Sequence, residues 1–483
     1  QTFITTALHY TDEDKLLANY TFENLNFGDS FAGNRHLFTG FLNGKKIRAS
    51  VNTSFLNTKA DTTDTRFFRI YSQAVYDLKK AWVGARLRAE DNQVENNISR
   101  KLDALSQRFT SYEGFTGVGD STNVFVEVGY RFRVNDSLKG ENLSRVNTSN
   151  TYYLKSQLVK NSSTSLGLFV NYRTLDYSDE NIEKERSLNS RLIYDQSFFN
   201  DIIRWNTVFE TNSGTLPQQE FTYVKVDEGQ GTYTWNDYNG NGVQELQEFE
   251  VAQFRDEADF IKILLPNQVF VRTHQNKLSQ LLTFNFQQWS GQNGFKKFAS
   301  HFYNQTSYLI DRKILRDGDN FDINPFNDSS DELGLNLSVR NTLFYNRGQQ
   351  KYSTSYTYLA TTTKNLLSIG LQENELRNNQ FNFLHRIKES YLFNLKSEIG
   401  STKSTSENYE NRNFDISNIN ISPKISYLFT DFSRLEAFYS FGKKDNELGD
   451  MENLKQQNLG LAFSYNNAEK ISLNGEVKYI KNS

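Results

Sequence analysis

The sequence predicts an all-β fold: a transmembrane antiparallel β-barrel of about 20 strands, within a range of about 16 to 22 or more, with one small insert domain. Three observations carry this prediction. Apolar and polar residues alternate with a period of two along most of the 483 residues. The alternating runs are long, and the composition combines few apolar residues with many aromatic ones.

The clearest alternation is the stretch NVFVEVGYRFRV, residues 123 to 134. Successive side chains of an extended strand point to opposite faces, so one face here is apolar and the other is charged. The charged positions are Glu127, Arg131 and Arg133. The apolar stripe consists of Val124, Val126, Val128, Tyr130, Phe132 and Val134. We expect the apolar stripe to face lipid.

The same period-two pattern predicts further strands along the chain. It recurs in order at residues 83–90, 166–173, 333–339, 418–429, 459–465 and 471–479. Several alternating runs extend over about 10 to 13 residues, whereas strands of soluble domains average about 5–6 and a tilted membrane-spanning strand needs about 9–11. The faces opposite the apolar stripes mix Gly, Ser and Asn with Arg and Glu, as in a barrel lumen. A large soluble β-protein is the alternative.

Composition and charge narrow the possible classes of protein further. The 26 Tyr and 39 Phe residues exclude an aromatic-poor disordered chain, and the mean hydropathy of −0.66 suits a protein that exposes apolar residues only in a narrow band. The formal charge of −3 gives no indication of nucleic-acid binding. The absence of Cys excludes disulfides, thiol catalysis and Cys-based metal sites. No apolar window of about 18 residues predicts a transmembrane helix.

One segment interrupts the alternation. Residues 214–276 look like a small folded insert, so the predicted organisation is barrel strands over 1–213, the insert over 214–276 and barrel strands over 277–483. The first ten residues, QTFITTALHY, already have the pattern of a strand. We therefore expect that a signal peptide has been removed or that the chain is a fragment.

The Asn- and Tyr-rich strands, the initial Gln and the insert GTYTWNDYNGNGVQELQEFEVAQF resemble large, mostly uncharacterised outer-membrane β-barrel proteins of the Bacteroidota. The resemblance in strand composition extends over the whole chain, whereas a detailed resemblance is limited to the insert. It implies the outer membrane of a Gram-negative bacterium, in contact with lipid and lipopolysaccharide. Outer-membrane barrels usually finish on a strand with a terminal aromatic residue, and NGEVKYIKNS does not, so we expect residues to be missing from one or both ends.

The insert contains the sharpest local motif, DYNGNGVQELQE, residues 237–248. It fits the twelve-residue calcium loop of EF-hands, in which Gly242 would make the sharp turn. The ligands would be Asp237, Asn239, Asn241, Val243 through its carbonyl, Glu245 and Glu248. We predict a weak, structural Ca²⁺ site, because two Asn replace Asp and lower the ligand charge. The alternative is an Asx-rich hairpin turn.

Charged residues on the faces opposite the apolar stripes are predicted to point into the lumen. There they would line a channel, bind a plug or form stabilising ion pairs between strands. The residues are Arg86, Arg88, Glu90, Glu127, Arg131, Arg133, Arg173, Lys396, Glu398, Lys424, Glu476 and Lys478.

We predict that the protein is not an enzyme. Its five His residues are scattered singly and no GxSxG motif is present, although His301 or His385 could serve an outer-membrane hydrolase.

We expect a barrel subunit of an envelope transport, secretion or outer-membrane assembly complex, with other envelope proteins as partners. A free-standing channel and a surface scaffold or ligand-binding barrel are the alternatives. A TonB-dependent importer is disfavoured, because such receptors carry a plug domain before the barrel and this chain starts with strands.

Overall fold

A computed structural model describes most of the chain. The residues outside the description are 13, 14, 29, 228, 229, 237–241, 243, 245–247, 253–257, 317, 319, 328–331, 350, 368, 369, 407–411, 450 and 468–470. Only the backbone is described at residues 216–221, 251, 264–270, 366, 367, 370 and 467. The described chain divides into two compact units, residues 1–193 and 194–483.

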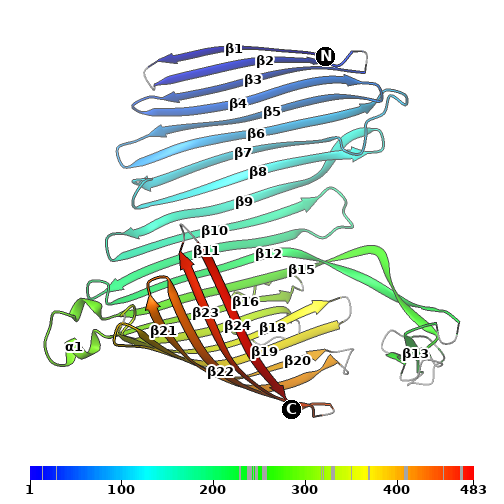
Figure 1. The fold of residues 1–483 in the computed structure, drawn as a ribbon. Coiled ribbons are helices and arrows are strands. Elements are labelled where there is room, and N and C mark those ends of the chain that lie inside the picture. Colours follow the sequence, from blue (N-terminus) through cyan, green and yellow to red (C-terminus); the bar gives the residue numbers. More distant parts are fainter. Residues whose placement is uncertain are drawn as a thin grey trace. The chain divides into compact units, whose positions relative to one another are not determined.

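The first unit is a meander in which each strand pairs antiparallel with the next, from β1 to β10 (Figure 1). Its strands are β1 (Thr2–Asp12), β2 (Leu16–Asn26), β3 (Phe31–Asn43), β4 (Ile47–Ala60), β5 (Thr63–Asp77), β6 (Ala81–Asn96), β7 (Gln107–Gly119), β8 (Phe125–Lys139), β9 (Asn142–Lys160) and β10 (Thr164–Tyr177). Strand β11 (Glu185–Phe198) crosses the boundary between the units.

The second unit repeats the antiparallel meander, from the pair β12–β15 to the pair β23–β24. Its elements are β12 (Ile203–Lys225), β13 (Tyr233–Trp235), β14 (Phe249–Val251), β15 (Phe260–Asn285), the 3₁₀ turn η3 (Gln287–Trp289), α1 (Phe295–Ala299), β16 (Phe302–Leu315), β17 (Glu332–Tyr345), β18 (Tyr352–Leu367), β19 (Gly370–Ile387), β20 (Tyr391–Ser406), β21 (Phe414–Thr430), β22 (Ser433–Asn446), β23 (Asn453–Asn467) and β24 (Ile471–Asn482).

Strand number and length confirm the predicted fold class. Over the described residues, 22 of the 24 strands are at least 11 residues long, and the other two, β13 and β14, have three residues each. The 22 long strands fall within the predicted range. Each is long enough to cross a bilayer with tilt, which needs about 9–11 residues. No helix among the described residues is long and apolar enough to cross a membrane.

Burial in the strands is inverted relative to a soluble protein. In β8, the apolar residues Val128 and Tyr130 are 47% and 41% exposed, whereas Glu127 on the opposite face is 9% exposed. The neighbouring strand β7 repeats this, with Tyr112 56% and Glu113 5% exposed. A soluble sheet would bury its apolar face in a core, so this arrangement is the one expected where the apolar face meets lipid.

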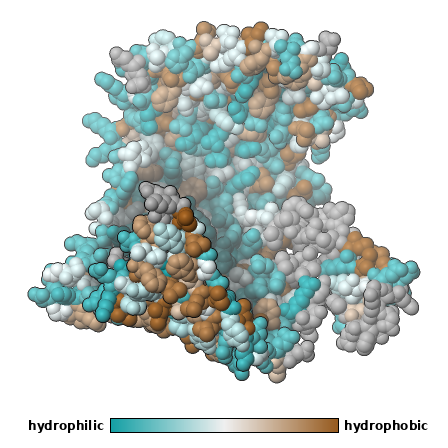
Figure 2. Space-filling model, in the orientation of Figure 1, coloured by the Kyte–Doolittle hydropathy of each residue, from teal (hydrophilic) through white to brown (hydrophobic). Residues whose placement is uncertain are grey.

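The same inversion recurs in the second unit. Apolar side chains gather on the surface over β23 and β24 (Figure 2). The register places Leu459 opposite Tyr479 and Leu461 opposite Val477, so these residues share one face, and each is more than half exposed. On the polar side of this unit, Ser426 and Asn378 are buried.

Glycines on one strand pack against aromatic rings on the neighbouring strand. Gly84 lies directly opposite Phe115, Gly117 opposite Trp82 and Gly129 opposite Tyr153. In all three pairs the aromatic ring covers the glycine and occupies the place that a Cβ atom would need. These rings fill the space left by the missing side chains and build the small core of the first unit, in which Val75, Trp82 and Phe115 are buried.

Strands β12 and β15 form an arm that extends past the neighbouring strand. They are 23 and 26 residues long, and β16 pairs with β15 only from Thr273 onward. The remaining 260–272 part of β15 pairs with the end of β12 and leads to β13 and β14 (Figure 1). We call residues 226–259 the head and the paired segments 216–225 and 260–272 the arm. The predicted insert, 214–276, thus contains the head and the ends of two long strands.

Candidate functional site

The candidate site lies on the polar face of strands β5 to β9. We define this face by Gln73, Arg86, Glu113, Arg131 and Tyr153. The register places the first four in one row, because Gln73 is opposite Arg86, Arg86 opposite Glu113 and Glu113 opposite Arg131. Directly opposed residues of antiparallel strands lie about 4.5–5.5 Å apart, so long side chains in such a row contact one another.

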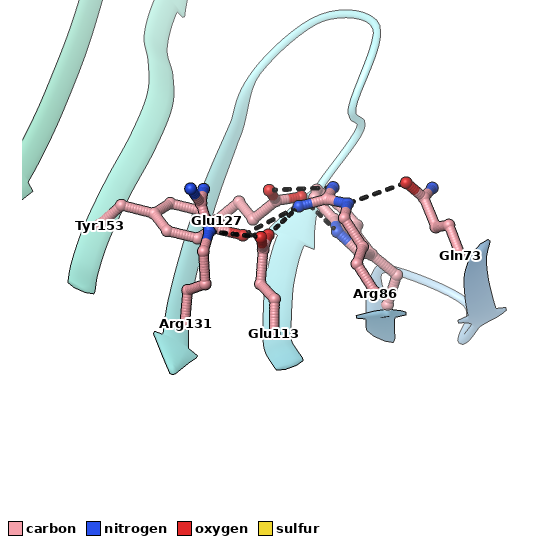
Figure 3. Close-up of polar contacts among 7 residues, drawn as sticks. Gln73, Arg86, Glu113, Glu127, Arg131 and Tyr153 are labelled. Carbon is pink, nitrogen blue, oxygen red and sulfur yellow. Dashed lines mark hydrogen bonds and ion pairs between the residues drawn. The ribbon is translucent and has the colours of Figure 1, made fainter. Parts of the chain in front are cut away.

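Glu113 is the centre of this row (Figure 3). Its Oε2 accepts a hydrogen bond from Arg131 Nε at 2.9 Å, and its Oε1 accepts one from the Tyr153 hydroxyl at 2.9 Å. Arg86 forms an ion pair with Oε1 and donates through Nε to Gln73 Oε1 at 2.8 Å. The buried Glu113 carboxylate therefore binds two arginines and one tyrosine, which lie on β6, β8 and β9.

Glu127 extends the network along the next row. Its Oε2 accepts a hydrogen bond from Trp82 Nε1 at 2.9 Å, and its Oε1 lies 4.0 Å from Arg86 Nη2. The network of Arg86, Glu113, Glu127 and Arg131 carries two positive and two negative charges. We call these four residues the Glu113 network. Its charges balance, so the network needs no ion from outside.

A hollow of about 530 Å³ lies beside the Glu113 network. Four arginines line it, together with the aromatic side chains of Tyr71 and Phe109. The four are Arg86, Arg88, Arg131 and Arg133. The Arg133 guanidinium lies over the Phe109 ring, 4.0 Å from its centroid, and donates through Nε to Asn135 Oδ1 at 2.8 Å. We call this space the arginine hollow.

The structure thus brings together five of the predicted lumen-facing residues, namely Arg86, Arg88, Glu127, Arg131 and Arg133. Glu90 is on the same face, with a carboxylate oxygen 3.5 Å from the Tyr71 hydroxyl. Arg173 on β10 lies opposite Thr151, which is itself opposite Arg131. These seven residues all belong to the first unit.

The other five predicted residues lie in the second unit and form separate contacts. Lys424 Nζ donates to Glu436 Oε1 at 3.1 Å, and Glu398 accepts a hydrogen bond from Asn378. Lys396 lines a hollow of about 340 Å³, and Glu476 lines one of about 320 Å³. Lys478 lies opposite Gly460.

The sequence prediction missed Glu113, Tyr153 and Trp82. The segment RFTSYEGFTGVG, residues 108–119, carries a usable signal, because Glu113 is the one acidic residue in a strand made mostly of small and aromatic residues. A lone carboxylate on such a strand needs basic partners on the neighbouring strands. Which partners it has depends on the register.

A second buried polar group surrounds His274, which is 1% exposed. Its Nε2 is 2.6 Å from the Thr211 hydroxyl, and its ring lies against Phe321 in the connection between β16 and β17. Asn276 Nδ2 donates to the Asp322 carbonyl at 2.6 Å in that connection. The connection therefore packs onto the polar face of β15.

The head contains the predicted calcium loop. Asp237, Asn239, Asn241, Val243 and Glu245 lie outside the described residues, and their role stays a prediction. Gly242 is described and has φ of +70°, the left-handed conformation that the sharp turn of a calcium loop needs. Glu248 is 3% exposed and accepts a hydrogen bond from Trp235 Nε1 at 2.9 Å.

The ends of the loop are held together. The Asn236 amide donates to the Glu248 carbonyl at 2.9 Å, and β13 pairs with β14 directly beyond. The predicted loop is therefore closed by two short strands. Among the described residues, no group of three or more His, Asp or Glu is arranged to hold a metal. The rings of His301 and His385 contact the aromatic rings of Tyr345 and Tyr352, respectively.

No protein-family description matches this chain, and no curated protein matches it. Among solved structures, the siderophore receptor PirA from Pseudomonas aeruginosa is 8% identical over 100% of this chain and 76% of its own, with a TM-score of 0.35. The Serratia marcescens hemophore receptor HasR, in complex with its hemophore HasA and heme, is 10% identical over 99% and 80%, with a TM-score of 0.27.

A further solved structure with similarity is OmpT, an outer membrane protein of Vibrio cholerae, which is 10% identical over 77% of this chain and 95% of its own, with a TM-score of 0.22. Similarities at these levels place the chain in none of these families. Its own strand lengths and inverted burial give it the fold class of the outer-membrane β-barrel proteins of Gram-negative bacteria.

Proposed function

We propose that this chain is the membrane-spanning β-barrel part of an envelope transport, secretion or outer-membrane assembly complex in a bacterium of the Bacteroidota type. The observation that carries the proposal is the inverted burial of the strands: the apolar face of β7 and β8 is exposed and the polar face is buried. The apolar faces would contact lipid and lipopolysaccharide. We assign it neither a catalytic activity nor a nucleic-acid partner.

The arm supports a subunit of a complex over a pore acting alone. The 13 residues of β15 beyond its pairing with β16 correspond to a length of about 40 Å. The head at the end of the arm is packed: Tyr233 and Ala258 are buried in it, and Phe260 at the start of the second arm segment is buried against it. A pore needs no such extension, whereas a folded head held away from the sheet can bind another envelope protein.

Co-purification from detergent-solubilised membranes tests this proposal. We expect other envelope proteins to purify with the chain in stoichiometric amounts. We also expect them to be lost when residues 226–259 are replaced by an Asn-Gly turn. The control replaces the exposed connection 178–184 with the same turn, and it should keep the partners. A wild-type chain that purifies alone and monodisperse would overturn the complex.

A free-standing channel is the second candidate, and the arginine hollow favours it. Basic side chains along a polar face give a pore a preference for anions. Single-channel conductance of the purified chain in planar bilayers distinguishes the two candidates. Steady conductance without partners supports the channel, whereas a silent chain with bound partners supports the complex.

We further propose that the head holds a structural Ca²⁺ ion. The described parts of the loop fit the ion: Gly242 has the required positive φ, and Glu248 at the twelfth position is buried within the head. When bound, the ion would bring the side chains of the loop together. Asp237, Asn239, Asn241 and Glu245 would supply the other side-chain oxygens and Val243 a carbonyl.

A further inference from the structure

We propose that the arginine hollow is a binding site for a phosphate group of a water-soluble molecule, held by Arg88 and Arg133. This inference rests on the proposed function in one respect, namely that the polar face of β5 to β9 is turned away from lipid. Among the described residues that line the hollow, four are arginines and none is acidic.

The four arginines differ in what they already bind. Arg86 and Arg131 are committed to the Glu113 carboxylate. Among the described residues, Arg133 donates a hydrogen bond only through Nε, to Asn135, so the hydrogens of both terminal amino groups stay available for a ligand. Over the part of the chain that the structure describes, the Arg88 guanidinium has neither a hydrogen bond nor an ion pair. Two guanidinium groups are therefore available.

The register places these two groups on opposite sides of the same small residue. Arg88 lies opposite Ser111, and Ser111 lies opposite Arg133. The two arginine Cα atoms are therefore about 10 Å apart, two strand spacings. Ser111 is buried and lines the hollow, and its short side chain leaves space between the arginines. Both side chains are long enough to approach one anion above it.

Positive charge is concentrated on this side of the face. Arg133 lies within electrostatic range of Arg131 and Arg173, and Glu90 offsets them only in part. The Phe109 ring against one side of the Arg133 guanidinium fixes its plane. An oriented guanidinium without a carboxylate partner, beside others of the same charge, is stabilised by an anion from solution.

The chemistry of the hollow selects the class of ligand. Planar guanidinium groups bind phosphate oxygens in pairs, and Tyr71 and Phe109 offer apolar surface to the rest of a molecule. A volume of about 530 Å³ is in the range of small-molecule sites. Because lipid is expected at the opposite face, we assign the phosphate to a soluble molecule and not to a lipid headgroup.

Isothermal titration of the purified chain in a non-ionic detergent, with inorganic phosphate and with pyrophosphate, tests the site. We expect both to bind, and we expect Arg88→Gln and Arg133→Gln each to raise the dissociation constant about tenfold. Arg145→Gln removes the same charge from β9 outside the lining and should change nothing. Arg88→Glu, at an exposed position without partners, should abolish binding with the fold intact by circular dichroism.

Unchanged binding in both Arg88 variants would overturn the proposal, as would equal weakening by Arg145→Gln. Binding of phosphatidylglycerol in mixed micelles without binding of either soluble phosphate would overturn the soluble source. The titration needs neither conductance nor partner proteins. A chain that retains its envelope partners but binds no phosphate would therefore remove this site and leave the proposed function standing.

Discussion

Glu113 is the residue on which the polar face of the first unit depends. It is 5% exposed, and its two carboxylate oxygens bind the side chains of Arg86, Arg131 and Tyr153. Removing one partner of a buried ion pair costs more than the pair gains, because the remaining charge stays buried without compensation. Here Arg131 would lose its carboxylate partner, and Arg86 would keep only the more distant Glu127, at 4.0 Å.

We predict that Glu113→Gln lowers the free energy of unfolding by about 3–5 kcal/mol, the usual cost of breaking a buried pair. Urea unfolding in detergent, followed by tryptophan fluorescence, measures it. Glu90→Gln is the control, because Glu90 makes one long contact at 3.5 Å to Tyr71, and it should cost less than about 1 kcal/mol. Equal losses in the two variants would show that the Glu113 network is not a centre of stability.

Position 129 has no space for a side chain, because Tyr153 on the neighbouring strand β9 occupies the place of a Cβ atom. The Tyr153 ring covers Gly129, and the Tyr153 hydroxyl is tied to Glu113, so the ring cannot move aside without breaking that hydrogen bond. The fit of ring over glycine therefore couples the packing of β8 and β9 to the Glu113 network.

We predict that Gly129→Ala destabilises the chain by about 1–3 kcal/mol through overpacking. Gly114→Ala on the adjacent strand β7 is the matched control, because nothing lies within 4 Å of a Cβ atom there. Thermal unfolding of both variants in detergent gives the comparison. Should Gly114→Ala prove as costly, general glycine effects in strands would explain the loss instead.

Among the elements, the head is packed against the arm through aromatic rings from separate parts of the chain. Tyr223 from the end of β12 stacks on Phe249 at 4.1 Å between ring centroids, and Phe249 packs against Phe260 at the start of β15. These rings join the head to the arm. A Ca²⁺ ion would add a second source of order at the other end of the head, in the loop between β13 and β14.

We predict that Ca²⁺ at about ten times its dissociation constant stabilises the head by about 1.4 kcal/mol, and that Mg²⁺ does so less. Hydrogen exchange of the head with and without Ca²⁺ measures this protection. Asp237→Asn should abolish it, whereas Asp227→Asn, the same charge change before the loop, should not. Protection that persists in Asp237→Asn would contradict the assigned ligands and favour an Asx-rich turn.

At the scale of the whole molecule, strands in both units expose apolar side chains and bury polar ones, whereas the terminal strands β1 and β24 are exposed on both faces. This inversion distinguishes a protein surrounded by lipid from a soluble β-protein, because in water the exposed Val128, Tyr130 and Tyr152 would favour aggregation. The co-purification experiment tests the whole molecule, because the arm and head act only if the rest of the chain is anchored in a membrane.

Period-two alternation predicted the strands, their approximate number and the face on which each side chain lies. Alternation is a local property, since successive residues of any extended strand point to opposite sides. The sequence therefore placed Arg86, Arg88, Glu127, Arg131 and Arg133 on the faces opposite the apolar stripes, and that they line a lumen stays a prediction. The motif at residues 237–248 predicted a calcium loop, with an Asx-rich hairpin turn as the alternative, and this stays a prediction because most of the motif lies outside the described residues; β13 and β14 flank it.

Only the tertiary structure decided which charges are paired and which are available. Glu113 meets Arg86 and Arg131 because two strand registers align residues 27 and 18 positions away in the chain, and a shift of one residue would turn each side chain to the other face. No local pattern encodes that alignment. The same register places Phe115 over Gly84 and Tyr153 over Gly129, and among the described residues it leaves Arg88 and Arg133 without carboxylate partners.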